Sequence, residues 1–166
     1  MSVTLNTSLG PLKLELRPDL APAACFNFLA LCAKGSYNNT IFHRSVRQQF
    51  IQGGDVDTKT GRTGFSIFHD NPKPCFSNAL SHSSRGTVSM TISPENSDSS
   101  QFFITFSSQP ELDGQFTVIG HVIAGMDVLD KMEGVQVDSR FRPLTDISVI
   151  STIIHSNPFA KGLLSL

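Results

Sequence analysis

The sequence of 166 residues is long enough for one well-formed core, and we expect a single domain over residues 1–166. Its composition, 39% apolar and 16% charged, is that of an ordinary globular protein. A formal net charge of −1 argues against a direct nucleic-acid partner, and no apolar run reaches the length of a membrane-spanning helix.

The first predicted element is a β-hairpin. Apolar and polar residues alternate over residues 3–5 and again over residues 12–16. Residues 8–11 between these two runs include Gly10 and Pro11, which favour a tight turn. The chain is therefore expected to begin with two antiparallel strands.

A helix is predicted from Pro22 to residues 34–35, because proline favours the first turn and lysine followed by glycine is typical of a helix end. Between them an apolar stripe at helical spacing includes Cys25 and Cys32, which we interpret as small core side chains. With Cys75 the thiols are odd in number and show no Cys-x-x-Cys spacing, and the N-terminus lacks a secretory signal. We therefore expect a cytoplasmic or nuclear protein.

Strand patterns dominate the rest of the chain. They are predicted at residues 41–45, 49–54, 86–92, 101–106, 117–123 and 147–154, with a short helix at residues 126–132 that Gly134 ends. Residues 56–85 read as a loop, long enough to be functional or packed on itself. Many short strands, few helices and no βαβ rhythm predict a closed or nearly closed antiparallel barrel with helices at its ends.

A hydrolase triad has to be considered, because serine, histidine and aspartate are plentiful. The chain has no Gly-x-Ser-x-Gly motif and no cysteine next to a histidine. Such triads assemble in space, so the sequence leaves this possibility open. The five histidines lack metal-ligand spacing and the glycines match neither a P-loop nor a dinucleotide motif. We expect no metal and no cofactor.

Arg44 lies in a stretch, residues 41–55, where two short apolar segments flank a polar turn. A permanent cation beside apolar neighbours is costly unless its hydrogen-bond donors are used. Arg44 is therefore either a structural cation tied to a carboxylate or to loop carbonyls, or a functional donor.

Four motifs in the chain resemble those of the cyclophilins, the peptidyl-prolyl cis–trans isomerases. They are Phe42-His43-Arg44, Gln52-Gly53-Gly54-Asp55, Ser100-Gln101-Phe102-Phe103-Ile104, and Leu112-Asp113-Gly114 followed by Gly120. Residues 142–144 and 155–160 further resemble the single-domain, spliceosome-associated subgroup. The resemblance covers nearly the whole chain. It implies a mostly-β fold, a closed eight-stranded antiparallel β-barrel capped by two α-helices, with the active site on its outer face.

The resemblance implies an enzyme that rotates Xaa-Pro bonds and so assists protein folding, with Arg44 as the catalytic arginine and Gln52 and Phe103 as its catalytic partners. Twisting the amide breaks its resonance, and the prolyl nitrogen then regains a lone pair that can accept a hydrogen bond. A donor that binds the twisted state more strongly than the planar one lowers the barrier. Because arginine does not titrate, little pH dependence is expected near neutrality from this group.

The resemblance also assigns a surface that binds proline-containing peptides or proteins. Its residues are Gln49, Phe50, Gly61, Thr91, Ile92, Ser93, Gln101, Glu111, Leu112 and Phe116. The proline ring is expected to enter an apolar pocket, while the backbone of residues 91–93 pairs with the extended peptide. Arg62 borders the neighbouring pocket, where we expect it to favour an acidic residue two places before the proline.

The chain departs from the family pattern at Gln49 and Phe50, where phenylalanine and methionine are usual. Loss of this aromatic wall of the proline pocket costs on the order of 1–3 kcal/mol of apolar contact, unless the ring of Phe50 takes the place of the missing phenylalanine. Glu111 stands where a tryptophan supports cyclosporin, so weak cyclosporin binding is expected. The chain is thus expected to be an active, monomeric isomerase. The alternative is a proline-peptide binding module with weak catalysis, a scaffold among spliceosomal proteins in a ribonucleoprotein assembly.

Overall fold

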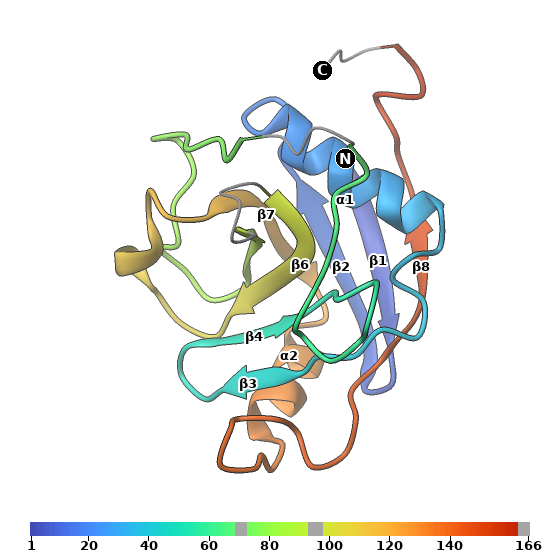
Figure 1. Cartoon of the computed structure of the whole chain (residues 1–166). Helices are drawn as coiled ribbons and strands as arrows, with labels where there is room; N and C mark the ends of the chain where they lie inside the picture. Colours follow the sequence, from blue (N-terminus) through green and yellow to red (C-terminus); the bar gives the residue numbers. More distant parts are fainter. Residues whose placement is uncertain (69–72, 93–97, 163–166) are drawn as a thin grey trace.

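The computed structural model describes residues 1–68, 73–92 and 98–162. Its elements, in chain order, are β1 (Ser2–Thr7), β2 (Gly10–Leu16), α1 (Pro22–Ala33), β3 (Arg44–Val46), β4 (Phe50–Gly53), β5 (Thr87–Ile92), β6 (Asp98–Thr105), the 3-10 helix η1 (Pro110–Leu112), β7 (Thr117–Ala124), α2 (Met126–Gly134) and β8 (Val149–Ile154). Figure 1 shows α1 across the upper end of the sheet and α2 at its lower end. None of the described helices is long and apolar enough to cross a membrane.

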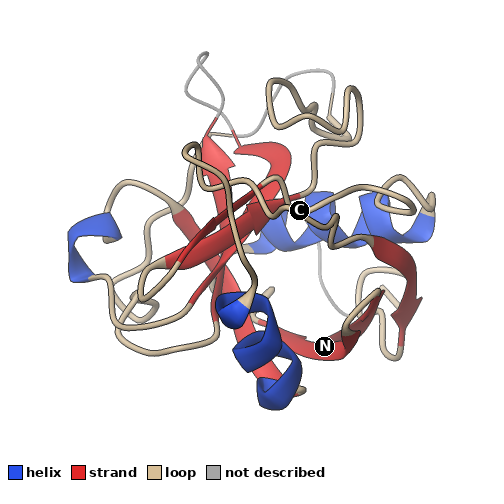
Figure 2. Ribbon diagram, turned by 90° about the horizontal axis from the view of Figure 1, so that it is seen from below, coloured by secondary structure: helices blue, strands red, loops and turns tan. Residues whose placement is uncertain are grey.

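All the strands belong to one antiparallel sheet, in the order β3-β4-β6-β5-β7-β2-β1-β8. The sheet twists strongly, as the view from below shows (Figure 2). Within the described residues, its edge strands β3 and β8 form no ladder with each other. Backbone hydrogen bonds between residues 39–42 and 147–149 join the two edges instead. The predicted eight-stranded antiparallel fold with two capping helices is confirmed, and this short junction curls it into a barrel-like shape.

Of the six strands predicted after the first helix, three begin two or more residues away from the predicted start. The strand expected from residue 41 begins at Arg44, because Phe42 N–H donates to the carbonyl of Ile147 at 2.8 Å and not to β4. The last strand begins at Val149 for the same reason, since residues 147–148 belong to this junction. β6 begins at Asp98, three residues before the predicted 101, through pairing with Ile92.

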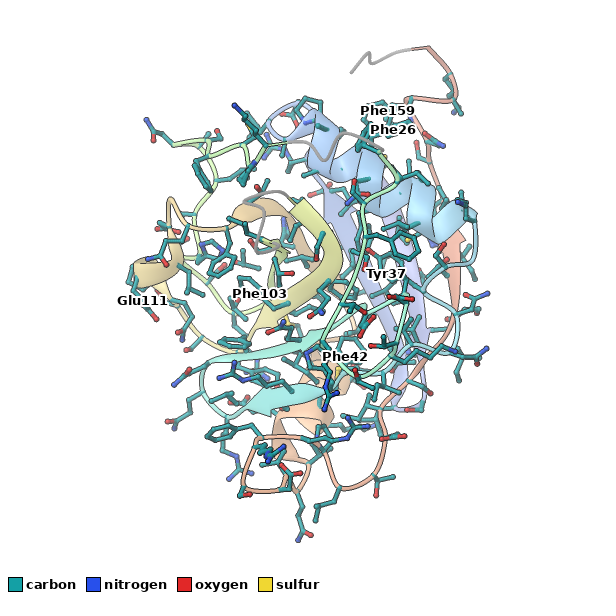
Figure 3. All side chains as sticks on the ribbon, viewed as in Figure 1. Phe26, Tyr37, Phe42, Phe103, Glu111 and Phe159 are labelled. Atoms are coloured by element: carbon teal, nitrogen blue, oxygen red, sulfur yellow. The ribbon has the colours of Figure 1, made fainter. Side chains whose placement is uncertain are left out.

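The core lies between the inner face of the sheet and α1. Phe102 of β6 is at its centre, fully buried, with the rings of Phe28, Tyr37 and Phe42 packed edge-on at 5.3–5.9 Å. Figure 3 shows Tyr37 and Phe42 in this interior. Cys25 and Cys32 are buried here as predicted, and burial raises the pKa of each thiol to about 12.

Candidate active site

Strand register brings the three predicted catalytic residues into one row. Arg44 on β3 lies opposite Gln52 on β4, and Gln52 lies opposite Phe103 on β6. Residues opposite each other in an antiparallel pair point to the same face of the sheet. The alternate residues Ile51 and Phe102 are fully buried in the core. The row therefore lies on the outer face of the sheet.

Arg44 is exposed, and its Cζ atom lies 5.5 Å from the centroid of the Phe50 ring, within range of a cation–π contact. No hydrogen bond or ion pair ties its guanidinium to another residue that the structure describes. In the described ranges, therefore, neither a structural carboxylate nor a loop carbonyl occupies its donors. The geometry favours the functional interpretation of this cation.

Aromatic rings form an apolar surface beside Arg44. Phe103, which is 3% exposed, packs against Phe50 at a centroid distance of 5.5 Å and edge-on against Phe116 at 5.3 Å. Phe50 and Phe116 are half-buried. Gln49 precedes Phe50 in the turn between β3 and β4, and its side chain is exposed. Phe50, not Gln49, therefore packs against the central ring.

A pair of amides connects this row to the loop that follows β4. Gln52 Nε2 donates to Gln101 Oε1 at 2.8 Å, and Gln101 Nε2 donates to the carbonyls of Gly61 and Thr63 at 3.0 and 2.6 Å. The Gln52 side chain is thus engaged with Gln101, and no side-chain hydrogen bond joins it to Arg44 within the described residues. The amide pair fixes the loop against the sheet.

A cavity of about 300 Å³ adjoins the amide pair. Its lining residues are Gln52, Gly61, Arg62, Thr63, Gly64, Thr91, Ile92, Ser99, Gln101 and Phe116. Half of the ten predicted substrate residues meet here, namely Gly61, Thr91, Ile92, Gln101 and Phe116. Leu112 is half-buried and Glu111 exposed in η1, at the outer margin of Figure 3. Ser93 lies outside the described residues.

Sequence reasoning missed three residues of this cavity, Thr63, Gly64 and Ser99. Ser99 is buried, its hydroxyl lies 3.1 Å from that of Thr91, and it accepts the Gln101 N–H at 3.0 Å. Ser99 directly precedes the motif at residues 100–104. That motif does not indicate that the Ser99 side chain lines the cavity.

The loop wall of the cavity is organised by the buried carboxylate of Asp55. Burial alone would raise the pKa of this group, but hydrogen bonds from the Thr58 hydroxyl and from the N–H groups of Gly61, Thr58 and Asp57 outweigh it and hold the pKa well below its usual range. Burial also lowers the pKa of His43, which packs under Gly61. Both groups are therefore expected to keep one charge state near neutrality.

The fold also assembles a serine, a histidine and an aspartate beneath the rings. His82 Nδ1 lies 2.7 Å from Asp113 Oδ1, and His82 Nε2 lies 3.0 Å from Ser89 Oγ. The imidazole stacks on Phe103 at 5.7 Å and 16°. A nucleophilic serine must reach its substrate, whereas Ser89 and His82 are both 0% exposed. This arrangement supports the Phe103 ring and does not form a hydrolase site.

No group of three histidine, cysteine, aspartate or glutamate side chains in the described residues could hold a metal ion. The described part of the site offers an exposed guanidinium, an apolar ring surface and oriented amides. Such a site can bind and polarise a neutral group next to an apolar ring.

Comparison with known proteins gives one consistent result. The family model described as "Cyclophilin type peptidyl-prolyl cis-trans isomerase/CLD" matches residues 2–154. The chain is 50% identical over 161 residues to "Peptidyl-prolyl cis-trans isomerase-like 3" of Dictyostelium discoideum, covering 97% of this chain and 99% of that protein. It is 46% identical over 160 residues to "Peptidyl-prolyl cis-trans isomerase 10" of Caenorhabditis elegans, covering 96% and 99% of the two chains.

A solved structure is similar over almost the same length. It is the crystal structure of a Cryptosporidium parvum cyclophilin type peptidyl-prolyl cis-trans isomerase, in the presence of the dipeptide Ala-Pro. The TM-score is 0.89 at 40% sequence identity, and the match covers 95% of this chain and 100% of that chain.

Proposed function

The chain belongs to the cyclophilin-type peptidyl-prolyl cis–trans isomerases, and we propose that it twists Xaa-Pro bonds on the surface formed by Arg44, Phe50, Phe103 and Phe116. The barrier to this rotation, about 18–20 kcal/mol, comes from amide resonance. The two planar isomers differ by only about 0.5–1 kcal/mol. The enzyme therefore needs to stabilise the twisted amide alone, without a covalent step.

The single observation that carries this proposal is the row of Arg44, Gln52 and Phe103 across three strands. The proline ring lies against Phe103, between the rings of Phe50 and Phe116. Arg44, which has no carboxylate partner among the described residues, then donates to the prolyl nitrogen when twisting localises its lone pair. This hydrogen bond strengthens as the planar amide becomes twisted, which is the requirement for catalysis.

The rest of the peptide binds along the cavity side of the site. Pairing of β5 with β7 ends at Met90 and Thr117, so the backbone of Thr91 and Ile92 is free of β7 and can bond to an extended peptide. Gln101 is held by its bonds to the loop carbonyls, and Gln52 is held by Gln101. These fixed amides orient the peptide relative to Arg44.

The proposal is tested by replacing Arg44 with alanine and measuring kcat/KM in a coupled assay on a proline peptide. Loss of a donor that acts on the transition state is expected to lower kcat/KM by about 10²–10³-fold. Arg140→Ala, which removes an exposed arginine of the segment after α2, is the matched control and should keep the wild-type rate. Equal rates for Arg44→Ala and the wild type would refute the assignment.

The alternative, a binding module with weak catalysis in a ribonucleoprotein assembly, rests on Gln49 and Glu111. The argument from Gln49 assumes that the proline pocket has lost an aromatic wall. The Phe50 ring provides such a wall, because it packs on Phe103 at 5.5 Å while Gln49 is exposed. These contacts support an active isomerase. A wild-type rate no higher than that of Arg44→Ala would favour the binding module.

Arg62 lines the cavity beside Gly61, and it supports a preference for an acidic residue two places before the proline. Peptides with aspartate or glutamate there are expected to show several-fold higher kcat/KM than neutral ones, since an exposed ion pair contributes about 0.2–1 kcal/mol. Arg62→Ala should remove the difference. A peptide panel without any acidic preference in the wild type would exclude this role.

Glu111 and the cysteine thiols support two further expectations, on cyclosporin binding and on location. Exposed Glu111 in η1 supports weak binding of cyclosporin, and a submicromolar affinity by calorimetry would contradict it. The free thiols of Cys25, Cys32 and Cys75 support a reducing location in the cytoplasm or nucleus. Microscopy of the tagged chain tests the location, and a signal confined to secretory compartments would contradict it.

A further inference from the structure

Arg85 lies between the end of β6 and α2, outside the proposed active site. Its Nη1 donates to the carbonyl of Phe106 at 2.8 Å, and its Cζ lies 5.5 Å from the centroid of the Phe106 ring. The same guanidinium pairs with Glu133 and with Asp130, each at 2.5 Å. The Arg85 and Glu133 side chains are 29% and 21% exposed, whereas that of Asp130 is 68% exposed. Arg85 therefore fixes the Glu133 carboxylate in a partly buried position.

The second oxygen of Glu133 reaches the turn between β3 and β4. It accepts the N–H of Gln48 at 2.9 Å. The Gln48 carbonyl accepts the Ser107 hydroxyl and Gln109 Nε2, and the Gln49 carbonyl accepts the N–H of Phe106 at 2.8 Å. Polar backbone groups on both sides of the turn are thus held by α2 and by the segment after β6.

The conformation of Gln48 explains why the turn needs these bonds. Its φ is +65°, in the left-handed region, where a Cβ crowds the following carbonyl oxygen at an energetic cost. No hydrogen bond of its side chain to another described residue offsets this cost. The backbone bonds, including the one to Glu133, are what stabilise the turn.

This turn sets the position of the proposed catalytic surface. Residues 47–49 join β3, which carries Arg44, to β4, which begins with Phe50. Phe50 packs on Phe103 and lies under the Arg44 guanidinium. Rotation of the turn would move the Phe50 ring relative to both groups.

We propose that Arg85 and Glu133 are positioning residues for the isomerase reaction, because Arg85 orients Glu133 and Glu133 holds the turn that places Phe50 beside Phe103 and Arg44. This inference rests on the proposed function of that surface. Neither residue touches the substrate. Their effect passes through the backbone of Gln48.

The test compares Arg85→Ala and Glu133→Ala with Asp130→Ala as the matched control. Asp130 also pairs with Arg85, but no described hydrogen bond joins its side chain to residues 47–49 of the turn. We expect kcat/KM on a proline peptide to fall about tenfold for Arg85→Ala and Glu133→Ala, because small misplacements of binding groups are costly in rate. Asp130→Ala should stay within about twofold of the wild type. The ring signals of Phe50 in NMR spectra should shift only in the first two variants.

A rescue separates positioning from a loss of folding. Glycine adopts a positive φ without strain, so Gln48→Gly in the Glu133→Ala background should recover most of the lost kcat/KM. All assays are run below the thermal unfolding range of every variant, as checked by circular dichroism. Unchanged activity in Glu133→Ala, or no recovery in the double variant, would overturn the inference.

Arg44→Ala, assayed in parallel, keeps this result separate from the proposed function. Loss of activity in Arg44→Ala together with a wild-type rate in Glu133→Ala refutes the positioning role alone. Wild-type activity in Arg44→Ala refutes the catalytic surface. The positioning role is then still decided by whether Glu133→Ala loses activity relative to the wild type and whether Gln48→Gly restores it.

Discussion

At the scale of single residues, His82 shows how a residue type associated with catalysis can serve as support. Its ring is fully buried, bonded to Asp113 on one side and to Ser89 on the other, and stacked on Phe103. In the same site Arg44 is exposed and has no ion-pair partner among the described residues. Exposure and partners, not residue type, separate the two roles.

One single and one double variant test the supporting role of His82. His82→Phe keeps a ring under Phe103 but leaves the buried Ser89 hydroxyl without the partner that it has in the structure, and we expect a loss of about 2–3 kcal/mol in unfolding free energy. Adding Ser89→Ala removes the unpaired hydroxyl and should restore about 1 kcal/mol or more. Denaturant unfolding measures both variants. A double variant no more stable than the single one would argue against this account.

At the scale of elements, the loop from residue 56 to residue 64 acts as a rigid wall although it contains no helix or strand. The Asp55 carboxylate gathers its N–H groups, and Gln101 bonds to its carbonyls. Gly61 has φ +89°, and a Cβ there would lie 2.1 Å from Cδ2 of His43. The loop can approach the sheet this closely because it has a glycine at this point.

Two glycine substitutions separate backbone strain from the clash with His43. Gly114 also has a positive φ, +74°, but open space surrounds the position of its Cβ. We expect Gly114→Ala to cost about 1 kcal/mol of unfolding free energy, and Gly61→Ala to cost about 2–3 kcal/mol because the loop must also move. Gly61→Ala should in addition weaken peptide binding in a calorimetric titration. Equal effects of the two variants on stability and on binding would contradict this explanation.

At the scale of the whole molecule, several carboxylates couple stability to pH. Hydrogen bonds lower the pKa of Asp19, through Arg17, of Asp113, through the backbone N–H of His82, and of Asp138, through the backbone N–H of Arg142. Asp55 has its pKa lowered most clearly, because its bonds outweigh the effect of burial. Each group binds protons more weakly in the folded chain than in the unfolded chain.

Stability should therefore fall on acidification. A lowered pKa in the folded state stabilises the protein above the unfolded-state pKa of about 3.9, and this contribution is lost as the pH falls towards the folded-state value. The denaturant midpoint is expected to fall gently as the pH drops below about 6.5, because burial lowers the pKa of His43 in the folded chain, and to fall more steeply below about pH 4 as the carboxylates are protonated. Asp55→Asn should flatten this drop, while Asp57→Asn, which alters an exposed neighbour, should not. Equal acid sensitivity of both variants would be evidence against the role of Asp55.

The sequence by itself predicted the order of the elements and the candidate residues of the site. Period-two alternation located the opening hairpin, helical spacing placed Cys25 and Cys32 on a buried face, and the motifs singled out Arg44, Gln52 and Phe103. Such signals are local, because the direction of a side chain along a strand or helix follows from its spacing in the chain. Strand starts at residues 44 and 149 were missed, because a junction between distant segments replaces local pairing there.

Only the tertiary structure decided how these residues meet. Register across β3, β4 and β6 aligns Arg44, Gln52 and Phe103, and the turn between β3 and β4 leaves the ring of Phe50, not the amide of Gln49, against Phe103. The part that Ser99 and Thr63 play in the cavity likewise depends on segments far apart in the chain. These outcomes depend on pairing and packing between remote residues, which the order of residue types along one strand does not encode.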